Sequence, residues 1–130
     1  MLIVLVLTLV AHEALHAAGY AIAGAKARFG IGMLGILPVL YTTVKDNKKL
    51  TISQVLFAGY LPFVALSVLL IMIGIIFPHY GQVTSFAFIV NAAGSVGDLY
   101  IATKLWKYAG VRGIRVTDTK DGFEIYSTSK

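Results

Sequence analysis

The residues best suited to chemistry form the pattern His12-Glu13-Ala14-Leu15-His16, near the start of the chain. In a helix, residues four apart differ by about 40° around the axis and about 6 Å along it, so both imidazoles can reach one metal ion. Glu13 would then lie near the ion without having to bind it, which is where a general base for water is needed. The pattern therefore predicts a zinc site with His12 and His16 as ligands and Glu13 as the base.

A third ligand is required, because a catalytic zinc ion usually takes three protein ligands and keeps one position open. The sequence has no cysteine, and the remaining histidine, His79, falls in a turn that we expect on the opposite side of the membrane. Asp98 lies roughly 9 Å inside the boundary marked by Lys104, and His16 lies roughly 15 Å inside its own boundary, at 1.5 Å per residue. Helix tilt and side-chain length can bring these depths together, so Asp98 is the predicted third ligand.

Asn91, Ser95 and Asp98 share one stripe of a predicted helix, with Gly94 and Gly97 beside it. The glycines are expected to let helices approach closely, and Ser95 is expected to pack between them. Asn91 has two roles that the residues alone leave open. It either donates a hydrogen bond to the substrate or to a developing oxyanion, or it holds neighbouring helices together.

Composition indicates a membrane protein. Of the 130 residues, 58% are hydrophobic and 13% are charged, where a soluble domain has near half and about a quarter. Three apolar stretches, at residues 2–25, 50–77 and 83–108, are long enough to cross a bilayer. Gly59 and Pro62 interrupt the second stretch, so its spanning helix is expected to begin at about residue 61. The net charge of +5 is then explained by the membrane and not by nucleic-acid binding.

Glu13 and Asp98 stand out because they fall within these apolar helices. A charged side chain near the bilayer centre costs about 2.5 to 3.5 kcal/mol. A bound metal ion offsets such a cost, since structural zinc sites contribute on the order of 10 kcal/mol. The alternative is a set of His and Glu side chains that bond to neighbouring helices without a metal.

The basic residues set the expected orientation. All eleven Lys and Arg residues fall within residues 26–49 and 104–130, and both regions should face the cytoplasm. The N-terminus and the turn at residues 78–82 are then external, and the C-terminus is internal. A removable signal peptide ending near Ala23 or Ala25 is the alternative for the first stretch, but the metal motif lies in the same segment.

Two segments are predicted to form β-structure. Glycine and β-branched residues in 26–49 favour a short apolar hairpin or looped sheet. Alternating apolar residues around Asp121-Gly122 predict a small hairpin in the C-terminal tail. The chain is therefore expected to be an α-helical membrane protein with three transmembrane helices, a membrane-associated β segment after the first and a cytoplasmic C-terminal β-hairpin. Its core is residues 1–107 and its tail residues 108–130.

The tail and the basic loop carry weaker signals. Residues 45–49 and 112–120 are expected to lie against anionic headgroups, where each charge contributes about 1 kcal/mol. Asp118 and Asp121 are expected to serve turn formation, with a second cation site as the alternative.

These features resemble the catalytic core of the site-2 protease class of intramembrane zinc metalloproteases, and most closely the small prokaryotic zincin peptidase families. The matching residues are the His12-Glu13-Ala14-Leu15-His16 motif, the apolar glycine-containing segment after it, and Asn91 followed by Gly97-Asp98-Leu99-Tyr100. The resemblance covers most of residues 5–107.

The resemblance implies that His12, His16 and Asp98 ligate zinc. It also implies that Glu13 is the base and proton shuttle, and that Asn91 helps to bind the substrate or its oxyanion.

By the same resemblance, residues 29–43 would be a membrane-embedded sheet that presents the substrate as an added strand. The expected partner is a membrane-embedded protein or peptide substrate, and the expected location is a prokaryotic cell membrane. The sequence does not set the oligomeric state.

Two other classes of function remain open at this stage. A non-catalytic metal-binding or ion-transport membrane protein would use the same ligands and tolerate Glu13→Gln. A catalytically silent scaffold would bind other membrane proteins through its small-residue faces and hold no stoichiometric metal.

Overall fold

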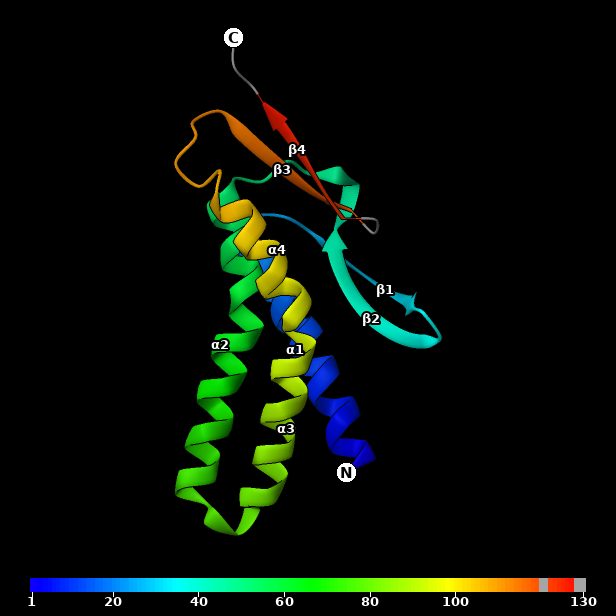
Figure 1. Cartoon of the computed structure of the whole chain (residues 1–130), viewed down its shortest axis with the longest axis vertical. Coiled ribbons are helices and arrows are strands. Elements are labelled where there is room, and N and C mark those ends of the chain that lie inside the picture. The colour runs from blue at the N-terminus through cyan, green and yellow to red at the C-terminus, as the bar shows by residue number, and fades with distance from the viewer. Residues whose placement is uncertain (120–121, 128–130) are drawn as a thin grey trace.

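The structure is a computed structural model that describes residues 1–119 and 122–127. Long helices lie side by side, and two β-hairpins lie beside and above the end of the bundle away from the α2–α3 turn (Figure 1). In chain order the elements are α1 (Leu2–Ile22), β1 (Ala27–Leu34), β2 (Leu37–Val44), η1 (Lys45–Asn47), α2 (Ile52–Ile76), η2 (Pro78–Tyr80), α3 (Gly81–Gly94), α4 (Val96–Trp106), β3 (Ile114–Thr119) and β4 (Gly122–Ser127). Lys120, Asp121 and Lys130, for which the sequence makes predictions, lie outside the described residues.

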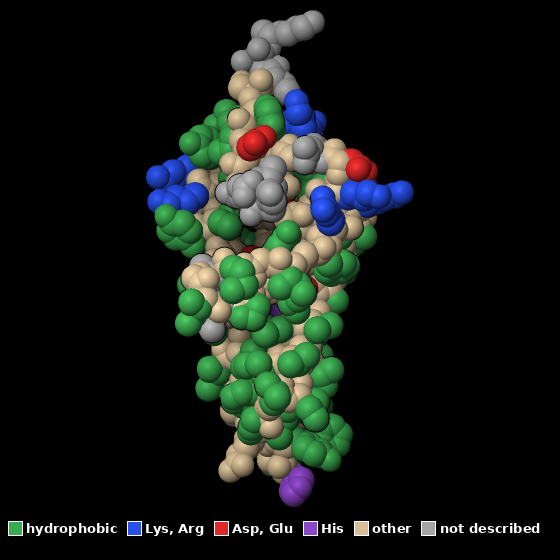
Figure 2. Space-filling model, turned by 90° about the vertical axis from the view of Figure 1, so that its right-hand side faces the viewer, with side chains coloured by type: hydrophobic (Ala, Val, Ile, Leu, Met, Phe, Trp, Pro, Cys, Tyr) green, Lys and Arg blue, Asp and Glu red, His purple; other side chains and the backbone are tan. Residues whose placement is uncertain are grey.

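The helices have the length and composition of membrane spans. Within the described residues, α1 and α2 each qualify, and residues 78–94 together with α4 qualify as one bent span, which gives two or three candidates. Apolar side chains cover the lower part of the visible face, whereas Lys and Arg gather near the end that carries β3 and β4 (Figure 2). This segregation agrees with the expected membrane protein.

The second helix is longer than the sequence predicted. It begins at Ile52 and not near residue 61, and it passes through both Gly59 and Pro62. A capping box starts it: the Thr51 hydroxyl accepts from the Gln54 backbone N–H, and the Gln54 side chain accepts from the Thr51 backbone N–H. Pro62 removes one intrahelical hydrogen bond, but the carbonyl it frees finds another donor, as described below.

The predicted third helix is broken. The stretch expected as one helix over 83–108 consists of α3 and α4, which meet at Ser95 with a bend of 43°. The Ser95 hydroxyl donates to the Asn91 carbonyl at 2.8 Å, a back-bond that bends helices, and Gly94 and Gly97 flank it. The break turns the first residues of α4 to a new direction.

Both predicted hairpins are confirmed. β1 and β2 pair antiparallel from Ala27↔Val44 to Leu34↔Leu37, and Gly35 supplies the positive φ of 64° that the turn requires. β3 and β4 pair antiparallel from Ile114↔Ser127 to Thr119↔Gly122.

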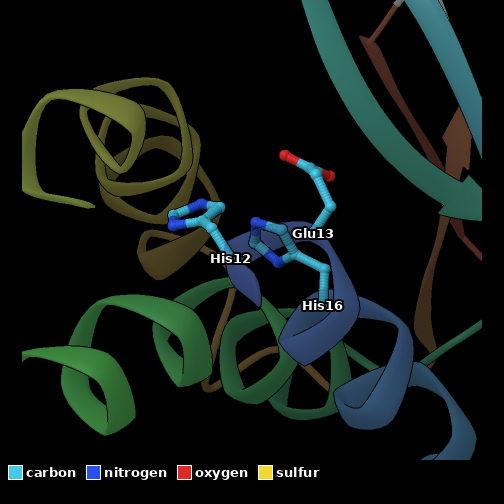
Figure 3. Close-up of side chains that lie close together, drawn as sticks. All are labelled: His12, Glu13 and His16. Atoms are coloured by element: carbon cyan, nitrogen blue, oxygen red, sulfur yellow. The ribbon is translucent and has the colours of Figure 1, made fainter. Parts of the chain in front are cut away.

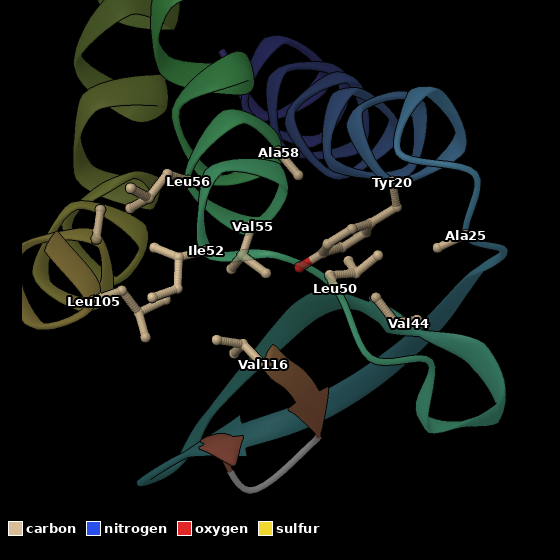
Figure 4. Close-up of a cluster of buried hydrophobic side chains, with 11 residues drawn as sticks. Tyr20, Ala25, Val44, Leu50, Ile52, Val55, Leu56, Ala58, Leu105 and Val116 are labelled. Atoms are coloured by element: carbon tan, nitrogen blue, oxygen red, sulfur yellow. The ribbon is translucent and has the colours of Figure 1, made fainter. Parts of the chain in front are cut away.

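A hydrophobic cluster joins the second hairpin to the helices (Figure 4). Val116 of β3 is completely buried, and it exchanges two backbone hydrogen bonds of 2.8 Å with Leu50. Tyr20, Val55 and Leu105 bring α1, α2 and α4 to the same cluster. The segment expected as a tail is therefore packed against the helical part of the molecule.

Candidate metal centre and its cleft

His12 and His16 lie one turn apart on the inner side of α1, and Glu13 projects beside them (Figure 3). Both imidazoles are buried, at 3% and 6% exposure, and their ring centroids are 4.9 Å apart. One ligand atom from each of the three side chains lies within 4.8 Å of those of the other two. The helical spacing thus places the three groups as expected from the sequence.

Asp98 reaches the histidines from α4. Its Oδ2 atom is 3.1 Å from His12 Nε2 and 3.1 Å from His16 Nε2. Asp98 occupies the first turn of α4, immediately after the bend at Ser95, so the break in the helix decides where this carboxylate points. The structure therefore brings together the three residues that the sequence offered as ligands.

The far side of His16 is held by the backbone of α2. His16 Nδ1 lies 2.9 Å from the Ala58 carbonyl oxygen. In an uninterrupted helix this carbonyl would accept from the N–H of residue 62, but Pro62 has no N–H to donate. The helices also touch here, since a Cβ built on Gly19 would lie only 2.7 Å from the Ala58 Cα. Gly19 and Pro62 together make the Ala58 carbonyl available to His16.

The far side of His12 is held by Asn91. His12 Nδ1 lies 2.9 Å from Asn91 Oδ1, and the Asn91 amide nitrogen donates to the Phe63 carbonyl and to Ser67 Oγ, each at 3.3 Å. The Phe63 carbonyl can only accept, which fixes the orientation of the amide and leaves its oxygen for His12. The sequence leaves two roles open for Asn91, a contact with the substrate or oxyanion and a link between neighbouring helices. The structure places it, 1% exposed, behind His12.

These contacts determine which nitrogen carries the proton. Both Nδ1 atoms face oxygens that can only accept, so both carry a hydrogen and donate it. In a neutral imidazole Nε2 then has a free lone pair. Two such lone pairs and an Asp98 oxygen converge at 3.1 Å. Acceptors are stable at this separation only around positive charge, supplied by protons on Nε2 or by a metal ion. Two imidazoles and a carboxylate form a donor set that suits catalytic zinc.

Glu13 stands apart from this arrangement. Its Oε2 atom is buried, and among the described residues it has no hydrogen-bond partner. Its backbone carbonyl accepts from the Thr42 hydroxyl of β2 at 3.2 Å, which joins α1 to the first hairpin. A buried, unpaired carboxylate oxygen is costly unless a ligand or water completes it. Glu13 is therefore available to a reactant in the adjoining cavity.

That cavity has a volume of about 270 Å³ and opens beside Glu13, His16 and Asp98. β2 forms one side of it, and α2 and α4 form another. Its other lining residues are Tyr20, Leu40, Tyr41, Thr42, Thr43, Val55, Leu56, Gly59, Gly94, Ile101, Ala102, Leu105, Asp118, Gly122 and Phe123.

Asp118 has a role that sequence reasoning missed. We expected it to serve a turn or a second cation site, but it is buried and accepts a 2.5 Å hydrogen bond from the Tyr20 hydroxyl. Burial raises the pKa of the Asp118 carboxyl to about 6, while the Tyr20 hydrogen bond acts in the opposite direction. The sequence offered one signal of this burial: Asp118 lies two residues after Val116, so the two side chains share one face of a strand.

Comparison with known proteins supports the metal chemistry. A family model described as "Putative zincin peptidase" matches residues 5–110, and these include His12, Glu13, His16 and Asp98. No curated protein and no solved structure matches the chain. The matched segment is most of the chain, which therefore belongs to the putative zincin peptidase family.

Proposed function

We propose that this protein is an intramembrane zinc metallopeptidase, which hydrolyses peptide bonds in or near transmembrane segments. The observation that carries the proposal is the convergence of Asp98 with His12 and His16, at 3.1 Å from each Nε2 atom. The two contacts join residues 86 and 82 positions apart, so the packing of α4 against α1 makes them. Membership of a putative zincin peptidase family also supports a metallopeptidase activity.

His12, His16 and Asp98 would hold the zinc ion. Zinc bound to them would act as a Lewis acid that lowers the pKa of water and polarises the scissile carbonyl. Asn91 and the Ala58 carbonyl orient the imidazoles, because each fixes Nδ1 as the protonated nitrogen.

Glu13 would move the proton. Its unpaired Oε2 accepts a proton from the attacking water, and the same oxygen returns it to the leaving nitrogen as the peptide bond breaks. In this proposal Glu13 carries the whole proton transfer.

The substrate would bind along β2. This strand pairs with β1 on one edge in a two-stranded sheet, and residues 40–43 line the cavity beside Glu13. An open strand edge recruits an extended peptide through backbone hydrogen bonds. A substrate helix must unwind to pair in this way, so helix-breaking residues near the cleavage site should accelerate the reaction.

The proposed orientation has the N-terminus outside and the C-terminus in the cytoplasm. It rests on the Lys and Arg distribution, and it places η2 outside and the cleft near the cytoplasmic face. The chain has no native cysteine, so Lys45→Cys and His79→Cys each introduce a single label site. An impermeant thiol reagent added to intact cells should modify His79→Cys alone. Modification of Lys45→Cys alone would show that the protein has the opposite orientation.

The activity is tested with purified protein and a synthetic transmembrane peptide of about 25 residues that carries a central Gly-Pro break, in lipid vesicles. Wild type should contain about one zinc ion per chain and cleave the peptide. Glu13→Gln should keep the zinc and lose cleavage. Undiminished cleavage by Glu13→Gln would remove the proposed mechanism, and zinc without cleavage in wild type would favour the non-catalytic metal protein.

A further inference from the structure

The C-terminal hairpin reaches the same cavity as the metal centre. Asp118 of β3 and Phe123 of β4 are directly opposed in the hairpin register. Both line the cavity that also contains Glu13, His16 and Asp98. The family match ends at residue 110, before β3 begins, so this wall of the cleft is supplied by the part of the chain outside the match.

The hairpin is fixed in place at several points. The Tyr20 hydroxyl donates to Asp118 at 2.5 Å, where both residues are buried. On the same strand, Val116 exchanges two backbone hydrogen bonds of 2.8 Å with Leu50. These contacts attach β3 to α1 and to the chain entering α2. A wall held by buried polar and backbone bonds keeps a defined distance from the reacting groups.

Apart from Asp118, its partner in the hairpin register, the neighbours of Phe123 in the cavity wall are apolar. Phe123 packs, partly exposed, against the hydrophobic cluster that includes Val55 and Leu105, and Ile101 packs there as well. All four residues also line the cavity. At about 270 Å³ the cavity is too small for a folded element, so a substrate would enter it as a short extended segment. One side of the cleft thus holds the proposed metal ligands, and another is apolar apart from Asp118.

We propose that the β3–β4 hairpin forms a substrate-binding wall of the cleft, in which Phe123, with Val55, Ile101 and Leu105, receives an apolar side chain of the substrate next to the scissile bond. The inference rests on the proposed peptidase function and names its substrate class: an extended segment with a bulky apolar residue at this position. Phe123 is accordingly a specificity-determining residue, and its size sets the size of the side chain that fits.

Peptide variants test whether Phe123 determines which substrate side chain is preferred. Each position flanking the cleaved bond is set in turn to Ala, Leu, Phe and Asp, and kcat/KM is measured for wild type, Phe123→Ala, Phe123→Trp and Ile125→Ala. Ile125 lies two residues along the same strand and is not among the cavity-lining residues, which makes it the matched control. At one substrate position, the Phe-to-Ala preference should rise about tenfold in Phe123→Ala and fall about tenfold in Phe123→Trp. Ile125→Ala should keep the wild-type ratio.

A purely structural hairpin gives a different result. Rates would then fall by one common factor for every peptide, and preferences unchanged within twofold in both Phe123 variants would overturn the inference while leaving the peptidase function intact. If wild type cleaves none of the peptides, the proposed function fails, and this inference fails with it.

Contact can also be tested without turnover. In the Glu13→Gln protein, Phe123 is replaced by the photoreactive aromatic residue benzoylphenylalanine, and Ile125 is replaced in a parallel sample. Irradiation with the Leu-containing peptide should attach it at position 123 and at least fivefold less at position 125. Equal attachment at the two positions, or attachment at 125 alone, would contradict direct contact of Phe123 with the substrate.

Discussion

His16 donates its Nδ1 hydrogen to the backbone carbonyl of Ala58, the same carbonyl that Pro62 leaves without a helical partner. A residue that weakens α2 thereby orients His16, the proposed metal ligand on α1. Helix stability and the orientation of the proposed ligand His16 are opposed at this position, and a substitution of Pro62 tests that opposition.

Pro62→Ala should separate the two effects. Restoring the N–H at residue 62 gives the Ala58 carbonyl a competing helical donor, so zinc affinity should fall about tenfold, as for other residues that orient a metal ligand. The helix itself should gain up to about 3 kcal/mol. Chelator competition and thermal unfolding of the zinc-free protein measure the two quantities. Pro78→Ala, in η2, is the control and should leave zinc affinity unchanged. An unchanged zinc affinity in Pro62→Ala would show that the Ala58 carbonyl does not orient His16.

Asn91→Leu distinguishes two roles of the amide. If Asn91 orients His12 through the 2.9 Å contact, the variant should lose 10- to 100-fold in zinc affinity. If the amide instead stabilises an oxyanion, zinc affinity should stay at the wild-type level while kcat falls about 100- to 1000-fold. We expect the first result, and titration of zinc in wild type and variant side by side decides between them.

Gly19→Ala should destabilise the contact between α1 and α2. The new methyl group would lie 2.7 Å from the Ala58 Cα, which forces the helices apart and costs about 1 to 3 kcal/mol. Gly59→Ala is the matched control, because a Cβ there meets nothing within 4 Å and helix propensity should add about 1 kcal/mol. Thermal unfolding in detergent measures both. Equal midpoints for the two variants would contradict the close approach.

The attachment of the second hairpin should depend on pH through Asp118. Its pKa is about 6 in the folded protein against 3.8 for the ordinary group, so the folded state binds the proton more tightly. The stability contributed by this proton is complete below about pH 4 and is lost as the pH rises through about 6, with a maximum change of about 3 kcal/mol.

Hydrogen exchange of the Val116 amide in zinc-free protein measures this change. Protection, corrected for the intrinsic exchange rate, should decrease from pH 4 to pH 7 in wild type and stay level in Asp118→Asn. Tyr20→Phe removes the donor that favours the carboxylate, so its transition should move to higher pH. The opposite displacement in Tyr20→Phe would show that the buried bond does not control the Asp118 proton.

The sequence predicted the groups that helical spacing controls. His12, Glu13 and His16 follow from a period of 3.6, and the depth argument for Asp98 needed the rise per residue with an allowance for helix tilt and side-chain length. Both hairpins followed from glycine positions and alternation. These features depend on local geometry, which short sequence windows contain.

The residues that orient the site could not be read in this way. The sequence alone predicts a helix start at about residue 61, because the donor that satisfies the carbonyl freed by Pro62 comes from another helix. The bend at Ser95 and the burial of Asp118 likewise depend on tertiary contacts, with the Asn91 carbonyl and the Tyr20 hydroxyl. Tertiary partners of polar groups have no sequence period, and they were missed for that reason.

Zinc X-ray absorption on the purified protein tests most directly whether His12, His16 and Asp98 hold one zinc ion. Wild type should contain about one zinc per chain, with nitrogen and oxygen neighbours at about 2.0 to 2.2 Å and imidazole scattering that diminishes in His16→Ala. Zinc far below one per chain in the wild type, or a spectrum that His16→Ala and Asp98→Ala both leave unchanged, would contradict this assignment.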